Sequence, residues 1–161
     1  MSGRQNDSDP PVAGHAPARQ TTIVPSVSIE LPFNHKVGFD GLYGLDITNV
    51  EPDCLRGQVQ VRDELKQPGG LIHGGVYAAM SESLASTGTA LEVIPNGKLA
   101  VGLSNQTSFL RPITQGTIFG AAKVKHRGRT TWVWEVELTD DDGRLCVLSR
   151  VTVAVRDLPR P

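Results

Sequence analysis

A glycine-rich turn that leads into a helical segment holds the residues of this sequence most suited to chemistry. Residues 69–75 read GGLIHGG, and a stretch with helical periodicity follows directly. Glycines let a ligand approach the backbone closely, and the first N–H groups of a helix have no partner within the helix. Helped by the helix dipole, the N–H groups of Gly74 or Gly75 could therefore stabilise a developing oxyanion.

Glu82 lies about two turns into the same segment, too far from its start to act as a cap. Its neighbours three and four positions away are all small, namely Ala78, Ala79, Ala85 and Ser86. A carboxylate among small residues, below a helix N-terminus, could act on a carbonyl carbon held at that N-terminus. Plainer interpretations stay open: Glu82 as a solvated surface residue, His73 as a structural residue at the helix start, and the glycines as a tight turn.

The elements that must position these residues follow from periodicity. A helix over about 76–91 is predicted, because the residues Val76, Ala79, Met80, Ser83, Leu84, Thr87 and Leu91 recur at helical spacing. The sequence Pro-Asn-Gly at 95–97 predicts its end.

Strands are predicted on both sides of this helix. Residues 130–139 alternate with period two, and Asp142-Gly143 predicts a hairpin turn into a returning strand at 144–156. Further strands are expected at 43–50, 55–61, 99–110 and 117–126. One long helix on an antiparallel sheet is an α+β fold, and its open sheet edges predict an oligomer.

Composition excludes several classes of function. The chain has 161 residues, and Lys+Arg 16 balances Asp+Glu 17, so neither nucleic acid nor an anionic membrane is an expected partner. Since there is no long apolar run or secretory signal pattern, we expect a cytoplasmic protein. Cys54 and Cys146 are too few for a disulfide framework or a zinc site, and no other metal motif is present.

One folding unit is expected. Residues 1–32 are rich in Pro, Gly, Ser and Gln, which predicts a flexible N-terminal tail. The single domain is placed at 33–157, with a short C-terminal tail at 158–161.

Two stretches of the sequence are similar to a known family. GLIHGGVYAAMSES at 70–83 and VGLSNQTSFLRP at 101–112 resemble the hotdog-fold acyl-CoA thioesterases of the PaaI type, closest to the Arthrobacter-type 4-hydroxybenzoyl-CoA thioesterase. The likeness extends over about 37–156. It implies a long central helix wrapped by an antiparallel sheet of five to six strands, assembled as dimers and commonly as dimers of dimers, that is, homotetramers.

The resemblance also implies catalytic roles. Glu82 becomes the catalytic carboxylate, either as nucleophile through a mixed anhydride or as general base on water. The Gly74 N–H polarises the thioester carbonyl, and Gln67 positions the nucleophile or the water. Ser86 supplies a hydroxyl one turn beyond the acid, and His73 is the histidine of the signature. No metal and no organic cofactor is implied.

Coenzyme A contacts are expected at three residues. Arg111 matches an arginine that binds the CoA phosphates, Arg129 could add a phosphate contact, and Thr130 keeps a hydroxyl on the nucleotide side. The sequence departs from the relative at Gly69, which stands where the relative has an aromatic residue and could reshape the acyl pocket.

Hydrolysis of an aromatic, 4-hydroxybenzoyl-like or related acyl-CoA to free acid and CoA is therefore expected. The acyl group stays open among 4-hydroxybenzoyl, phenylacetyl, dihydroxynaphthoyl and medium-chain groups. A hotdog acyl-thioester dehydratase or hydratase and a non-catalytic acyl-CoA-binding module are the alternatives.

Overall fold

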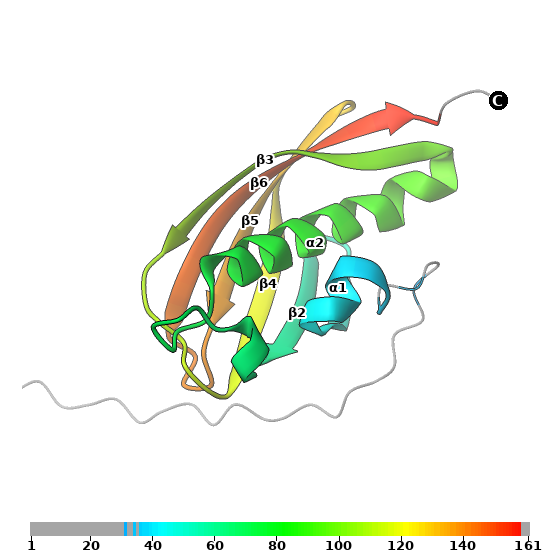
Figure 1. Ribbon diagram of the computed structural model, residues 1–161. Coiled ribbons are helices and arrows are strands. Elements are labelled where there is room, and N and C mark those ends of the chain that lie inside the picture. Colours follow the sequence, from blue (N-terminus) through cyan, green and yellow to red (C-terminus); the bar gives the residue numbers. More distant parts are fainter. Residues whose placement is uncertain (1–30, 32–33, 35, 159–161) are drawn as a thin grey trace, which may run out of the picture.

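A long helix lying across one face of a curved six-stranded sheet forms the body of the molecule (Figure 1). The computed structural model describes residues 31, 34 and 36–158. The tail expected at 1–32 lies, except for Leu31, outside the described residues, and so does the C-terminal tail beyond Leu158.

The chain order matches the α+β prediction. The elements are α1 (Gly38–Tyr43), β1 (Leu45–Glu51), β2 (Cys54–Gln60), α2 (Gly74–Val93), β3 (Lys98–Phe109), β4 (Thr117–Arg127), β5 (Thr131–Thr139) and β6 (Leu145–Asp157). Short 3₁₀ turns at Asp63–Leu65 and Ile94–Asn96 precede and follow α2. All neighbouring strands are antiparallel, in the order β1-β2-β4-β5-β6-β3. Helix α1 was not predicted, since six residues are too few to show a helical period.

Helix α2 packs closely on the sheet through small and apolar residues. Met80 and Leu84 are fully buried. A side chain at Gly88 would place its Cβ 2.6 Å from the ring of Trp134, so the helix backbone rests directly on that indole. The indole N–H donates to Thr89 Oγ1 over 2.9 Å, which fixes the helix along the sheet.

Strand β3 lies at one edge of the sheet and contains a β-bulge. Gly102 pairs with Val153 and Ser104 with Thr152, which leaves Leu103 as the extra residue. Beyond the bulge Asn105 pairs with Val151, which like Val153 is fully buried. Directly paired residues share a face, so Gly102 and Asn105 both face α2. In a regular strand, residues three apart would point to opposite faces.

Candidate functional site

The N-terminus of α2 presents one free backbone donor. The His73 side chain caps the helix, because its Nδ1 accepts the Gly75 N–H over 2.9 Å. The Gly74 N–H has no acceptor within the part of the chain that the structure describes. Of the two glycines that could hold an oxyanion, Gly74 is therefore the one whose N–H is available.

A surface pocket of about 460 Å³ opens at this helix start. Its lining brings together several residues singled out in the sequence, namely Gln67, His73, Gly74 and Arg111. The rings of Tyr77 and Phe109 also line the pocket, with centroids 6.0 Å apart. A Cβ at Gly74 would lie 2.9 Å from Phe109 Cζ, so the absence of a side chain lets the Phe109 ring pack against the helix start.

A tight turn presents Gln67 to the pocket. The Gln67 N–H donates to the Leu71 carbonyl over 2.8 Å, and the Gly70 N–H donates back to the Gln67 carbonyl over 2.9 Å. Gly70 has a φ of 79°, in the left-handed region that glycine adopts without strain. The glycines at 69–70 thus close the turn that carries Gln67.

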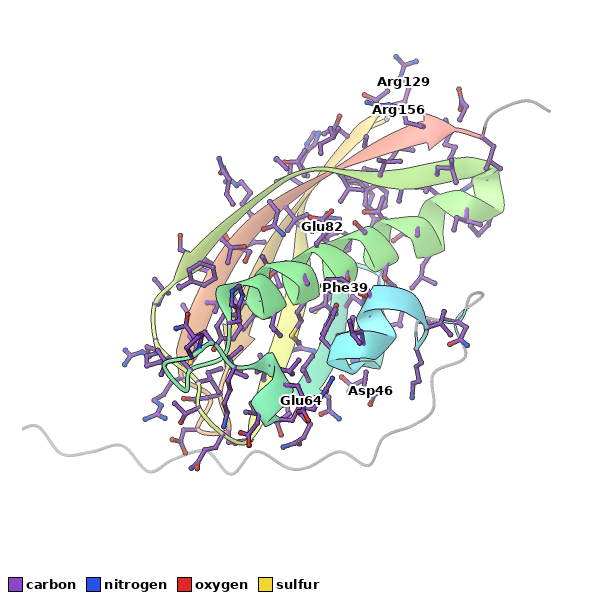
Figure 2. The ribbon with its side chains drawn as sticks, viewed as in Figure 1. Phe39, Asp46, Glu64, Glu82, Arg129 and Arg156 are labelled. Carbon is purple, nitrogen blue, oxygen red and sulfur yellow. The ribbon has the colours of Figure 1, made fainter. Side chains whose placement is uncertain are left out.

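Glu82 projects from α2 toward strand β3 (Figure 2). Its carboxylate accepts hydrogen bonds from Ser86 Oγ and from Asn105 Nδ2, each over 3.3 Å. The backbone of β3 passes so close at Gly102 that a Cβ there would overlap Glu82 Oε1. Glu82 is half-buried and lies against β3, so the structure does not support its interpretation as a freely solvated surface residue.

Asn105 and Gly102 were not predicted as site residues from the sequence. Both lie within the stretch 101–112 that carries the family resemblance, which was the signal available. Asn105 also donates to the Ala78 carbonyl over 2.9 Å, so its amide joins the edge strand to the helix beside the acid.

A single chain does not bring Glu82 and Gly74 to one reacting atom. Glu82 is eight residues beyond Gly74 on a continuous helix, which separates the two by about 12 Å along the axis. The pocket at the helix start and the carboxylate are thus separate features of one chain.

The predicted phosphate contacts are also divided. Arg111 follows the end of β3 and lines the pocket. Arg129 and Thr130 lie in the turn between β4 and β5, next to Arg156, whose Nη1 donates to the Thr130 carbonyl over 3.1 Å (Figure 2). Arg156 pairs with Leu99 at the start of β3. Sequence analysis missed Arg156, because one arginine at the end of a strand gives no pattern.

Burial controls the ionisation of the other reactive groups. It raises the pKa of Tyr77, whose Oη accepts the Ile113 N–H over 3.3 Å, to about 12. Burial also raises the pKa of the thiols of Cys54 and Cys146. Both cysteines are therefore protonated at neutral pH and poor nucleophiles.

Within residues 36–158 no three His, Cys, Asp or Glu side chains gather where a metal ion could bind. Among the described helices, none is long and apolar enough to cross a membrane.

Comparisons with known proteins place this architecture among thioesterases. A sequence profile of the Thioesterase superfamily matches residues 69–147. The Mycobacterium tuberculosis (strain H37Rv) protein Rv1847 is 40% identical over 136 residues, which cover 83% of this chain and 96% of the relative. The 1,4-dihydroxy-2-naphthoyl-CoA hydrolase of Listeria monocytogenes serotype 1/2a is 32% identical over 120 residues, covering 74% of this chain and 97% of the relative.

Solved structures agree with the sequence comparisons. The crystal structure of a thioesterase variant from Pseudomonas aeruginosa has a TM-score of 0.74 at 32% identity, over 77% of this chain and 89% of that chain. These neighbours and the single long helix on a six-stranded antiparallel sheet confirm the predicted hotdog fold.

Proposed function

Because the chain belongs to the thioesterase superfamily and is a thioester hydrolase, we propose that it hydrolyses an aromatic or related acyl-CoA with Glu82 as the catalytic carboxylate. The observation that carries this proposal is the half-buried Glu82, held by Ser86 and Asn105 on the helix face beside an edge strand. The Listeria relative, named as a hydrolase of 1,4-dihydroxy-2-naphthoyl-CoA, supports an aromatic acyl group, and a 4-hydroxybenzoyl group is one candidate within this proposal. The pocket walls formed by Tyr77 and Phe109 suit a flat ring.

A second copy of the chain would complete the site. Strand β3 is twelve residues long and pairs only with β6 in the described chain. It and the residue after it expose the large apolar side chains Val101, Leu103, Phe109 and Leu110. A long apolar edge of this kind is a template for pairing with another strand, and a two-fold axis would pair β3 with itself.

The spacing of Gly74, Ala78 and Glu82 along α2 favours the same two-fold pairing of subunits. Ala78 is the midpoint between Gly74 and Glu82, and Asn105 of β3 contacts it. If the two-fold axis passes at this level, antiparallel helices bring Glu82 of one subunit opposite Gly74 and Gln67 of the other. The small side chain of Ala78 then lets the helices approach. The dimer of dimers expected from the resemblance is part of this proposal.

The same axis would assemble the cations for coenzyme A. Asn105 is the midpoint between Leu99 and Arg111, so Arg111 would lie opposite the start of the partner's β3. There it would approach Arg129, Thr130 and Arg156 of the partner subunit. Such a cluster would bind phosphates of the nucleotide although the chain as a whole has a net charge of −1.

In the proposed reaction, Gly74 and Glu82 have separate roles. The Gly74 N–H donates to the thioester oxygen and stabilises its negative charge as the carbonyl carbon is attacked. As general base, Glu82 takes a proton from the attacking water; as nucleophile, it forms a mixed anhydride that water then opens. In both routes the C–S bond breaks, CoA leaves as the thiol after protonation, and the acyl group leaves as the carboxylate.

Thiol release from a panel of aromatic and aliphatic acyl-CoA esters tests the proposal. We expect aromatic esters to give the highest kcat/KM. Glu82→Gln should lower kcat by roughly 10²–10⁴-fold, whereas Glu92→Gln, on the same helix but bound to Arg127, should leave kcat unchanged. Near wild-type activity in Glu82→Gln would remove Glu82 from the mechanism. A 2-enoyl product from a 3-hydroxyacyl-CoA would instead favour a dehydratase, and CoA binding without turnover a binding module.

Mixing two inactive variants tests the shared site. The substitutions Glu82→Gln and Gln67→Ala each damage a different half of the proposed site. After co-expression, mixed dimers would each carry one intact site, so the preparation should recover about a quarter of the wild-type activity. No recovery would show that each chain acts alone.

A further inference from the structure

A chain of hydrogen-bonded side chains runs from the interior of the sheet to Glu82. Ser81 Oγ lies 2.9 Å from Ser149 Oγ, and Ser149 Oγ lies 2.9 Å from Thr107 Oγ1. Thr107 Oγ1 donates to Asn105 Oδ1 over 2.7 Å, and Asn105 Nδ2 donates to Glu82 over 3.3 Å. This series of hydrogen bonds thus begins on α2 at Ser81, passes through β6 and β3, and ends on α2 at Glu82, the residue after Ser81.

Each hydroxyl has a single proton, and this fixes the direction of every bond. Thr107 donates its proton to Asn105, so it must accept from Ser149. Ser149 then has no proton left and must accept from Ser81. Ser81 and Ser149 are 0% and 1% exposed, so water does not offer them other partners.

Two hydrogen-bond acceptors fix the orientation of the Asn105 amide. Its carbonyl oxygen accepts from Thr107, so its NH₂ group is turned toward the Ala78 carbonyl and the Glu82 carboxylate. The flipped amide would put an oxygen against both of these acceptors and would face the Thr107 hydroxyl with its NH₂ group. The two acceptors set the orientation of the amide, and the donating Thr107 hydroxyl holds it in place from the other side.

We propose that Asn105 is a positioning residue for thioester hydrolysis, held by Thr107, Ser149 and Ser81 so that its amide keeps the Glu82 carboxylate aimed at the substrate. This inference rests on the proposed function, because it assigns Asn105 a role through Glu82. Asn105 acts on the reacting carboxylate and contacts neither of the predicted phosphate-binding arginines. Its loss should therefore lower kcat and leave KM nearly unchanged.

A matched set of variants separates this role from a structural tie between helix and sheet. Asn105→Ala removes the donor and should lower kcat roughly ten- to a hundredfold, since bonds to charged groups are the strong ones. Thr107→Val keeps the side-chain shape but loses the hydroxyl, and should lower kcat roughly three- to tenfold. Thr107→Ser loses the methyl group but keeps the hydroxyl, and should retain wild-type kcat. Asn49→Ala, which removes an amide from strand β1 at the opposite edge of the sheet, is the control.

The experiment measures kcat, KM and the melting temperature for each full-length variant on the best acyl-CoA of the panel, with Glu82→Gln alongside. We expect kcat to depend on whether residue 107 has a hydroxyl group, and not on the volume of its side chain. Wild-type kcat in Asn105→Ala, or a Thr107→Ser variant as slow as Thr107→Val, would overturn the inference. If Glu82→Gln is inactive in that same set, the proposed function stands and only the role of Asn105 fails. A wild-type protein that hydrolyses no ester would overturn both.

Discussion

Replacing Gly102 with alanine should disable the enzyme while leaving its fold intact. The new Cβ would lie 3.0 Å from Glu82 Cδ and overlap Oε1. Ordinary van der Waals contact begins at 3.4 Å, so the carboxylate must swing by about 1 Å or more, and a misplacement of that size costs roughly a hundredfold in rate. The displaced group is the end of a flexible side chain, so we expect little change in the free energy of unfolding.

The assay is thiol release at saturating acyl-CoA, with the melting temperature and the molecular mass in solution measured on the same samples. Lys125→Ala, at an exposed position on strand β4, is the control and should match the wild type. Combining Gly102→Ala with Glu82→Gln should add no further loss, because the displaced group is already inactive. A Gly102→Ala enzyme with wild-type kcat would refute the reasoning, since Glu82 would then act from a position other than the one beside β3.

Three further predictions concern binding, packing and pH. Arg111→Ala and Arg156→Ala should each raise KM for acyl-CoA roughly tenfold with kcat nearly unchanged, and neither should affect a truncated thioester without phosphates; an equal effect on both substrates would argue against phosphate contacts. Gly88→Ala should lower the free energy of unfolding in urea by about 1–3 kcal/mol, because its Cβ would lie 2.6 Å from the buried Trp134 ring; unchanged stability would mean that the helix can move away from the sheet. Burial raises the pKa of Tyr77 from 10.0 to about 12, so its contribution to stability is complete below pH 10 and is lost as the pH rises toward 12. Urea unfolding at pH 9 and pH 11.5 should therefore show a smaller alkaline loss in Tyr77→Phe than in the wild type.

Local periodicity was enough to predict the long helix and the strands, whereas the hotdog fold was predicted from the family resemblance. Alternation at 130–139 and 144–156 predicted β5 and β6 within one residue at each end, and Gly143 has the positive φ expected in the turn between them. The helix expected at 76–91 is α2, which extends to Gly74 and Val93 because the His73 cap admits the two glycines into the first turn. These features depend on residues that are close together in the chain, so the sequence pattern was sufficient to predict them.

The site was predictable only where residues lie close together in the chain. Gln67, His73 and Gly74 line one pocket as the motif indicated, and Ser86 contacts Glu82 from one helical turn away. Asn105 is 23 residues from Glu82, and it faces the acid because Leu103 is accommodated as a bulge, which no sequence pattern marks. The roles of the catalytic and CoA-binding residues, the tetramer and the cytoplasmic location stay predictions.

The bulge in β3 also bears on how homologous chains can differ in length. On both sides of Leu103 the pairing with β6 keeps the same faces toward α2, so deleting this one residue would leave Gly102 and Asn105 pointing at Glu82. An insertion or deletion elsewhere in β3 would turn every residue beyond it to the other face of the sheet. We therefore expect position 103 to tolerate the loss of one residue without turning Asn105 away from Glu82.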